Sequence, residues 1–166
     1  MDLDFYENFD YLIGCDEVGR GPIAGPVNAC AVGISKQNRE IISYLKQLGV
    51  TDSKKLTQKK RLVILDKLGI NLETLKMNEV YEVKFENIGF NFILSELGPS
   101  KIDEINILQA SLECMKVSAE GLIVKNSMVL IDGNKKFNSD KAELLPVVKG
   151  DSKSVLIGIA SIIAKE

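Results

Sequence analysis

The sequence predicts an α/β fold, with a mixed central β-sheet flanked by helices, and three observations support this class. Two apolar segments near the N-terminus, 11–16 and 26–34, are joined by a Gly/Pro-rich turn, which is typical of adjacent strands. A third apolar segment, 128–132, is short and ends in an aspartate. Segments with helical spacing of apolar residues lie between and after these strands. This alternation indicates helices packed against a mixed sheet.

The length of the chain favours one domain. A chain of 166 residues is long enough for one core and short for two. It contains no internal repeat, low-complexity tract or Pro/Ser-rich linker. We therefore expect a single domain over residues 1–166.

Capping residues mark two helices in the first half of the chain. Asn38 is expected to cap a helix over 39–48, which Gly49 would end. Thr57 is expected to cap the segment QKKRLVILDKL, which Gly69 would stop.

The middle of the chain is less uniform. Residues 78–86 alternate apolar with polar side chains and predict a strand. Residues 88–100 fit either a helix or a loop. Asp103 is expected to cap a longer helix. Its apolar residues recur near helical spacing: Ile105, Leu108, Leu112, Met115 and Val117.

Two strands and a helix are expected in the last quarter. Segments 128–132 and 146–151 each predict a short strand with an aspartate at its end. Residues 152–166 predict a buried helix, although its β-branched residues weaken helix propensity. This helix reaches Glu166 without a C-cap or breaker, so we expect the chain to stop in mid-helix.

Composition excludes several kinds of chemistry. The chain has no histidine, which excludes histidine-based zinc sites, Ser-His-Asp triads and Cys-His dyads. Its three cysteines form no CxxC pair and no signal peptide precedes them, so we expect reduced thiols and a cytoplasmic location. No uninterrupted apolar run reaches 18 residues, so no membrane partner is expected. Any catalysis must use carboxylates, lysines, tyrosines or metals.

The net charge of −2 does not by itself indicate a nucleic-acid-binding protein. Basic residues nevertheless gather locally, and each cluster taken singly fits a solvated face. These clusters are Lys54-Lys55, Lys59-Lys60-Arg61, Lys135-Lys136, and Lys149 with Lys153.

Acidic residues occur where three apolar strands are expected to end. They are Asp16-Glu17, Asp132 and Asp151. Strand ends in α/β sheets concentrate functional side chains, and several carboxylates brought together repel one another unless cations neutralise them. Oxygen-only ligands suit Mg²⁺ or Mn²⁺, and two such ions can promote phosphodiester hydrolysis. For Asp132 and Asp151 a turn residue or helix cap remains an equal alternative.

Four motifs in order resemble the type 2 ribonuclease H family, bacterial ribonuclease HII in particular. They are CDEVGRGPIAGPV (15–27), TDSKKLT (51–57), VLIDGN (129–134) and KGDSKSVLIGIASIIAK (149–165), and INILQAS (105–111) is similar to the central helix of the family. The resemblance spans nearly the whole chain and implies a ribonuclease H-like fold. It also implies cleavage of RNA in RNA–DNA hybrids and nicking 5′ of single ribonucleotides in duplex DNA, with 3′-hydroxyl and 5′-phosphate ends.

The same resemblance assigns the acids. Asp16, Glu17, Asp132 and Asp151 would be catalytic and would bind two divalent cations, Mn²⁺ or Mg²⁺. Asp16 would bridge both ions, and Asp132 and Asp151 would each support one. RNA–DNA hybrids and ribonucleotide-containing duplex DNA would be the partners of an expected monomer.

The resemblance also assigns nucleic-acid contacts. Gly19, Arg20 and Gly21 would read the ribose 2′-hydroxyl, because glycines let the backbone approach closely. Ser53, Lys54 and Lys55 would hold phosphates, with a solvated helix start as the alternative. Asn106 would contact the DNA strand or cap a helix, and Lys149 and Lys153 would face the substrate or solvent. Ser161 is expected to let its helix pack closely on the sheet.

Two departures from the family pattern leave alternatives open. Family members continue beyond the last motif with helices that carry a substrate-stacking tyrosine, and we expect these helices to be missing here. Residues 86–100 match no family pattern. A two-metal nuclease of the same fold with other specificity, or a non-catalytic hybrid-binding fragment, are the alternative readings. An ATPase is disfavoured because the chain has no GxxxxGK[ST] loop.

Overall fold

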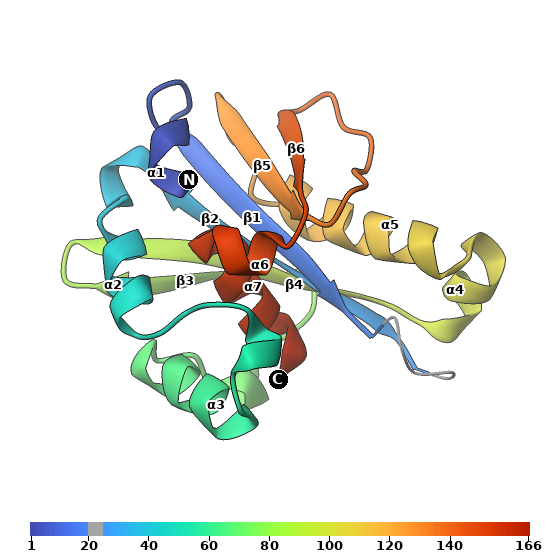
Figure 1. The fold of residues 1–166 in the computed structure, drawn as a ribbon. Helices are drawn as coiled ribbons and strands as arrows, with labels where there is room; N and C mark the ends of the chain where they lie inside the picture. Colours follow the sequence, from blue (N-terminus) through green and yellow to red (C-terminus); the bar gives the residue numbers. More distant parts are fainter. Residues whose placement is uncertain (20–24) are drawn as a thin grey trace.

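A single mixed sheet organises the molecule (Figure 1). The computed structural model describes residues 1–19 and 25–166, and its six strands in that part are ordered β3-β4-β2-β1-β5-β6. They are β1 (Tyr11–Val18), β2 (Val27–Ser35), β3 (Val80–Phe85), β4 (Ile88–Leu97), β5 (Ser127–Asp132) and β6 (Glu143–Val147). The first four strands pair antiparallel, whereas β5 runs parallel to β1 and β6 parallel to β5. The predicted mixed α/β fold is confirmed.

Helices cover both faces of the sheet. In chain order the α-helices are α1 (Asp2–Phe5), α2 (Ile41–Gln47), α3 (Gln58–Lys67), α4 (Pro99–Ile105), α5 (Ile107–Glu120), α6 (Gly150–Lys153) and α7 (Val155–Lys165). Short 3₁₀ turns are η1 (Lys36–Asn38), η2 (Ser53–Lys55) and η3 (Leu72–Thr74). In Figure 1, α7, α6 and α2 lie on one face and α5 on the other. Two apolar cores result, one on each face.

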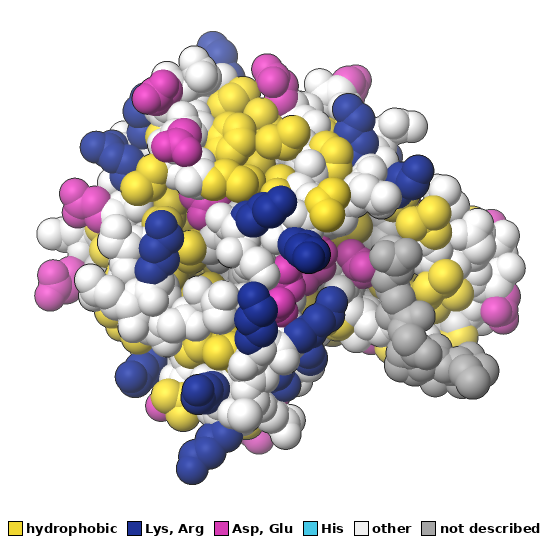
Figure 2. Space-filling view, viewed as in Figure 1, with side chains coloured by type: hydrophobic (Ala, Val, Ile, Leu, Met, Phe, Trp, Pro, Cys, Tyr) yellow, Lys and Arg dark blue, Asp and Glu magenta, His cyan; other side chains and the backbone are white. Residues whose placement is uncertain are grey.

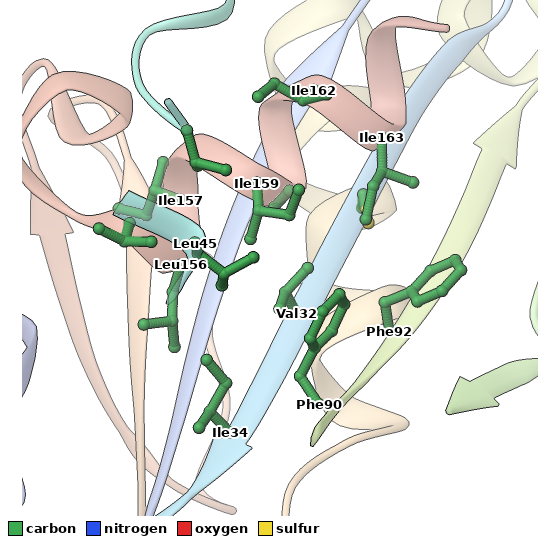
Figure 3. Close-up of a cluster of buried hydrophobic side chains, with 14 of the residues drawn as sticks. Val32, Ile34, Leu45, Phe90, Phe92, Leu156, Ile157, Ile159, Ile162 and Ile163 are labelled. Carbon is green, nitrogen blue, oxygen red and sulfur yellow. The ribbon is translucent and has the colours of Figure 1, made fainter. Parts of the chain in front are cut away.

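The larger core is built around α7. Every residue of α7 from Val155 to Ala164 is buried. Figure 3 shows its Ile159 and Ile163 directed toward the strands that carry Val32 and Phe92. A helix that is apolar all round is expected to be enclosed, and this one is covered by the sheet, α2 and α3.

Gly14 in β1 sets how closely α7 approaches the sheet. A Cβ atom at this position would lie 2.6 Å from the backbone nitrogen of Ile157 and 2.6 Å from the carbonyl carbon of Leu156. Only a residue without a side chain leaves room for the helix backbone here. The close contact fixes the distance between α7 and β1.

The N-terminus of α7 is capped from two places. The Ser154 hydroxyl accepts a hydrogen bond from the Ile157 N–H at 3.3 Å. The buried Asp2 carboxylate, from the first helix of the chain, accepts one from the Val155 N–H at 2.7 Å. Burial raises the pKa of Asp2, while the hydrogen bonds from Ser154 and Val155 oppose that rise. The two ends of the chain are thus joined at one helix terminus.

Arg61 is not part of a solvated basic cluster. Its side chain is buried, and Nη1 donates to the carbonyl oxygens of Ser53 at 3.0 Å and Leu56 at 2.6 Å. Its Nε pairs with the Glu166 carboxylate, which is also nearly enclosed. Lys59 and Lys60 are exposed, as expected. Arg61 was grouped with these lysines because they are adjacent in the sequence. Its position on α3 instead directs its side chain into the protein, where it binds backbone carbonyl oxygens.

Residues 88–97 form a strand, so the expectation of a helix or loop was wrong. β4 lies between β3 and β2 and is covered on both faces over most of its length. Its apolar residues therefore run together without the alternation that identifies a half-buried strand. By contrast, the alternating segment 78–86 does contain β3, as predicted.

Two helix starts differ from the expectation. Asp103 does not cap a helix, because α4 already begins at Pro99 and ends at Ile105. Asn106 then adopts φ +67°, which breaks the helix, and its side chain caps α5. Asn38 likewise lies within η1, and α2 begins only at Ile41. The Thr57 cap of α3 is confirmed by its hydrogen bond from the Lys60 N–H.

The last predicted strand is shifted. β6 ends at Val147, and Lys149 adopts a left-handed conformation with φ +56° that begins α6. Asp151 therefore lies in the first turn of a short helix and not at the end of a strand. None of the described helices is long and apolar enough to cross a bilayer. The cysteines Cys15, Cys30 and Cys114 are buried and form no disulfide.

Replacing Gly14 by Ala tests the close approach of α7. We expect Gly14→Ala to lower the free energy of unfolding by about 1–3 kcal/mol, because backbone atoms of α7 must move away from β1. Gly98→Ala is the control, since a Cβ there meets nothing within 4 Å, and its cost should stay below about 1 kcal/mol. Urea denaturation of both variants gives the comparison. Equal costs would contradict the close-contact explanation.

Candidate active site

Asp16 is a buried residue of β1 and lies on the face of the sheet that α7 covers. It is opposite Cys30 on β2, and Cys30 packs in the core on the α7 face. The carboxylate Oδ1 accepts the Glu17 N–H at 2.8 Å. Burial raises the pKa of Asp16 to about 7; a hydrogen bond with Ser161 opposes the rise, and the charges of Asp132 and Glu17 add to it. Asp16 is thus held in a place that penalises its charge.

Asp132 lies beside Asp16 on the neighbouring strand. The parallel register pairs Cys15 with Ile131, so the next position along each strand is Asp16 and Asp132. Asp132 Oδ1 accepts the Gly150 N–H at 2.7 Å, which ties the end of β5 to the start of α6. A Cβ at Gly150 would lie 2.9 Å from the same oxygen, so a side chain there would displace the Asp132 carboxylate.

Asp151 reaches the group from α6. Burial raises its pKa, and a hydrogen bond with Asp52 and the charge of Asp132 raise it further. Asp132 therefore acts on both Asp16 and Asp151, and three acids from β1, β5 and α6 share one region. Their assignment as catalytic and metal-binding residues stays a prediction.

Glu17 differs from the other three acids. It is opposite Ala29, which packs in the core on the α5 face, whereas Asp16 is opposite a residue of the α7 face. Alternation along β1 therefore turns the Glu17 side chain to the other face of the sheet. Its charge still raises the pKa of Asp16. To join the acids it must reach around the end of β1.

The donor set fits a hard divalent cation in its chemistry. Asp16, Asp132 and Asp151 offer only carboxylate oxygens, the ligands that Mg²⁺ and Mn²⁺ prefer. The raised pKa values of Asp16 and Asp151 reflect burial and mutual repulsion, which a positive charge would relieve. Within residues 1–19 and 25–166, however, no three acidic, cysteine or histidine side chains already converge as a ligand set. The carboxylates would have to draw closer around an ion.

Basic side chains surround the acids. Figure 2 shows acidic side chains gathered near the centre of this face with basic ones around them. Lys54, Lys55, Lys149 and Lys153 are all exposed. The charge of Lys54 lowers the pKa of both Asp52 and Asp151, which places its ammonium group near the acids. An anionic chain on this face would meet positive charge beside the carboxylates.

Comparison with known proteins decides the family. A family model described as "Ribonuclease HII" matches residues 13–166. A ribonuclease HII of Rickettsia canadensis is 38% identical over 170 residues, covering 99% of this chain and 72% of the relative. The chain belongs to the ribonuclease HII family. Members of this family are endoribonucleases of the ribonuclease H type, which act on RNA–DNA hybrids.

Solved structures agree on the fold. The ribonuclease H2 of Pyrococcus horikoshii OT3 is 26% identical with a TM-score of 0.69, covering 93% of this chain and 70% of that one. A ribonuclease HIII (Bst-RNase HIII) in complex with Mn²⁺ is 18% identical with a TM-score of 0.53, covering 97% of this chain and 53% of that one. The second likeness shows the ribonuclease H-like fold alone.

In this chain the GRG segment begins with a glycine whose positive φ other residues rarely adopt. Gly19 adopts φ +95°, and a Cβ there would lie 2.5 Å from the Pro26 carbonyl oxygen. Arg20 and Gly21 lie outside the described residues. The requirement for glycine at position 19 is thus explained by the backbone turn and by Pro26, whichever substrate group the segment meets.

Ser53 and Asn106 use their side chains within the protein. The Ser53 hydroxyl is 1% exposed and bonds the Ser161 hydroxyl at 2.9 Å, so it does not face a phosphate. Asn106 Oδ1 accepts the N–H groups of Leu108 and Gln109 at 3.0 and 3.1 Å, which is the capping alternative. Neither observation removes the backbone groups of these segments from a role in binding.

Two residues of this region were not singled out as acid partners from the sequence. Asp52 caps η2 through the Lys54 N–H at 2.9 Å and accepts the Ser152 hydroxyl at 3.4 Å. Ser161 was expected only to allow close packing, yet its hydroxyl lies 2.9 Å from that of Ser53, and it lowers the pKa of Asp16. Asp52 belongs to the quoted TDSKKLT motif, and Ser161 is a hydroxyl in an otherwise apolar helix. These two features of the sequence could have pointed to Asp52 and Ser161.

The acid cluster should make the metal-free protein less stable as pH rises. The folded-state pKa of Asp16, about 7, lies above the ordinary 3.8, so the folded protein binds more protons than the unfolded chain between these values. Stability therefore falls as pH rises from about 4 to 7, by up to about 4 kcal/mol from this group. Asp16→Asn should remove most of that fall, and thermal unfolding in EDTA measures it. Parallel pH profiles for both proteins would contradict the assignment.

Asp52 should control the titration of Asp151. Asp52→Asn removes a neighbouring negative charge while keeping an oxygen for the Lys54 N–H, so the pKa of Asp151 should fall toward its usual range. Carboxyl ¹³C NMR of the metal-free protein follows this titration. Asp103→Asn, an exposed change on α4, should leave it unaltered. An unchanged Asp151 titration in Asp52→Asn would show that the two carboxyls are not coupled.

Proposed function

We propose that this family member is a metal-dependent endonuclease with two related activities. It hydrolyses the RNA strand of RNA–DNA hybrids, and it nicks duplex DNA on the 5′ side of a single embedded ribonucleotide, leaving 3′-hydroxyl and 5′-phosphate ends. The observation that carries the proposal is that Asp16 and Asp132 follow the paired positions Cys15 and Ile131 on neighbouring strands, while Gly150, next to Asp151, donates its N–H to Asp132. The monomer would act on both substrates.

The acids would hold two divalent cations, Mn²⁺ or Mg²⁺. By the family resemblance Asp16 would contact both ions, while Asp132 and Asp151 would each support one and Glu17 would reach in from the end of β1. Bound divalent cations lower the pKa of water and stabilise the leaving oxygen in phosphodiester hydrolysis. The protein fixes Asp132 through the Gly150 N–H and Asp16 through the Glu17 N–H, so two carboxylates are oriented before an ion arrives.

The surrounding residues would bind and select the nucleic acid. Lys54 and Lys55 would contact phosphates, and Lys149 and Lys153 would add positive charge on the other side of Asp151. The Gly19-Arg20-Gly21 backbone would approach the ribose 2′-hydroxyl, the group that distinguishes RNA from DNA at one nucleotide. The lysines would position the nucleic acid, and the glycine segment would distinguish RNA from DNA.

A single-ribonucleotide duplex tests the proposal. We expect a nick 5′ of the ribonucleotide with Mn²⁺ or Mg²⁺, none with EDTA, and none in an all-DNA duplex. Asp16→Asn, Asp132→Asn and Asp151→Asn should each lower cleavage by more than about 100-fold, since even changes beyond the ligands cost about 10- to 100-fold. Asp66→Asn, an exposed acid on α3, is the matched control and should cleave normally.

Other outcomes of this assay point elsewhere. Equal cutting of the all-DNA duplex would indicate a nuclease with other specificity, and binding of the hybrid without cutting would indicate a binding fragment. Gly21→Ala should reduce cleavage at the ribonucleotide. If that variant kept the full preference for ribonucleotides, the proposed role of the glycine segment would be wrong.

A further inference from the structure

A buried arginine lies behind the turn that carries two lysines of the candidate site. The Arg61 side chain is 10% exposed, and its Nη1 donates hydrogen bonds to the carbonyl oxygens of Ser53 at 3.0 Å and Leu56 at 2.6 Å. Between these two residues lie Lys54 and Lys55, which are exposed. One guanidinium nitrogen therefore spans the turn η2 from its first residue to the residue that follows it.

The guanidinium group is itself held from the end of α7. Its Nε pairs with the Glu166 carboxylate, whose side chain is 3% exposed. A buried charge is costly unless it is paired and hydrogen-bonded, and both conditions are met here. Replacing a buried ion pair by apolar residues often leaves stability unchanged, so the pair is weak evidence for a stabilising role. The pair does fix the direction of the other Arg61 donors, because guanidinium donors lie in one rigid plane.

The turn that Arg61 braces lies against the helix that carries Asp151. Ser152 follows Asp151 on α6, and its hydroxyl accepts a hydrogen bond from the Lys55 ammonium group at 3.5 Å. The same ammonium group is 3.8 Å from the Asp52 carboxylate, which accepts the Ser152 hydroxyl at 3.4 Å. The turn is thus tied to the edge of the acidic region, where a nucleic acid at the acids would meet its lysines.

We propose that Arg61 is a positioning residue for nucleic-acid binding, which holds the turn of Lys54 and Lys55 in the conformation that contacts phosphates. Arg61 is enclosed by the protein, so it acts on the substrate through this turn and not by direct contact. A lysine carries its charge on a flexible four-carbon stem, so the backbone beneath it decides where that charge can reach. The inference rests on the phosphate contacts proposed for the two lysines.

The salt dependence of hybrid binding tests the inference. Arg61→Lys keeps the net charge but replaces the planar fork of donors by one ammonium group, which cannot keep all three bonds in their present geometry. We expect the Kd for a fluorescent RNA–DNA hybrid, measured by anisotropy in EDTA, to rise about 10-fold, the typical contribution of one hydrogen bond to a charged group. The slope of log Kd against log salt concentration should fall by about 1 to 2, because each lost phosphate contact lowers it by about 0.9. An unchanged slope would overturn the proposal.

Cleavage kinetics give a second readout of positioning. With Mn²⁺ present, Arg61→Lys should raise the KM for the hybrid and leave kcat unchanged, because the acids that would perform the reaction stay in place. A variant that lowered kcat with an unchanged KM would contradict a role in binding.

Arg39→Lys is the matched control. Arg39 also donates to a backbone carbonyl oxygen of a short 3₁₀ turn, that of Lys36 at 3.1 Å. This turn follows Ser35, which pairs with Tyr11 at the end of β1 far from Asp16. Arg39→Lys should therefore bind the hybrid with the Kd and the salt slope of the unaltered protein. A matching loss in Arg39→Lys and Arg61→Lys would show a general effect of the exchange and overturn the proposal.

Glu166→Gln separates positioning from stability. The amide keeps an oxygen that accepts from Arg61 Nε but removes the negative charge, so the melting temperature should fall. The bonds from Arg61 to the turn remain, so the Kd for the hybrid and its salt slope should stay unchanged. Equal weakening of hybrid binding in Glu166→Gln and Arg61→Lys would show a loss of overall stability and not of positioning.

The phosphate contacts and their positioning can fail separately. The double variant Lys54→Gln/Lys55→Gln removes the proposed contacts directly and should lower the salt slope at least as much as Arg61→Lys. If the double variant lowers the slope and Arg61→Lys does not, the positioning role is wrong while the phosphate contacts stand. If the double variant leaves the slope unchanged, the phosphate contacts fail first and the positioning role fails with them.

Discussion

The contact between α7 and β1 at Gly14 is the constraint on which the rest of the structure depends. Backbone meets backbone there, so the helix lies closer to the sheet than side chains would otherwise allow. That distance brings Ser161 within hydrogen-bonding reach of Ser53. It also encloses Asp16 in a setting that raises its pKa. Packing in the core and electrostatics at the site therefore have one cause.

The buried carboxylates lower the stability of the folded protein, and the same carboxylates are available to bind cations. Burying carboxylates near one another opposes folding, and the protein offsets this with hydrogen bonds from the Gly150 and Glu17 N–H groups. Those donors favour the ionised state that a cation needs. The lysines lie outside the enclosed group, where they are exposed to solvent and to an approaching polyanion. Acids at the centre and bases at the rim suit a reaction on a phosphodiester.

The sequence predicted the sheet class, and it singled out the acids of the candidate site, because both depend on local signals. Thr57 has the chemistry of a helix cap and is one. Asp16 and Asp132 lie near the ends of two apolar segments that form neighbouring parallel strands. Burial on both faces removed the alternation of β4, and a left-handed Asn106 divided one expected helix into two. Those features depend on tertiary neighbours, which no local pattern encodes.

The same limit applies at the site. The inward turn of Arg61, the pairing of Asp52 with Asp151 and the bond between Ser53 and Ser161 each join residues far apart in the chain. The motif resemblance identified the acids but not which face of β1 each one takes. The register of β1 against β2 shows that the side chains of Glu17 and Asp16 point to opposite faces of the sheet.

The hydrogen bond between Asp2 and Val155 has a consequence for how the chain folds during synthesis. It joins residues 153 positions apart, and the central strand β1 likewise pairs with β5 from the far end of the chain. Contacts of such long sequence separation form slowly, because much of the chain must be ordered to close them. In a nascent chain β1 would therefore lack its parallel neighbour until β5 had been synthesised, and α7 would gain its Asp2 cap only after that. Until then the apolar strands near the N-terminus would be exposed to chaperones and to other nascent chains.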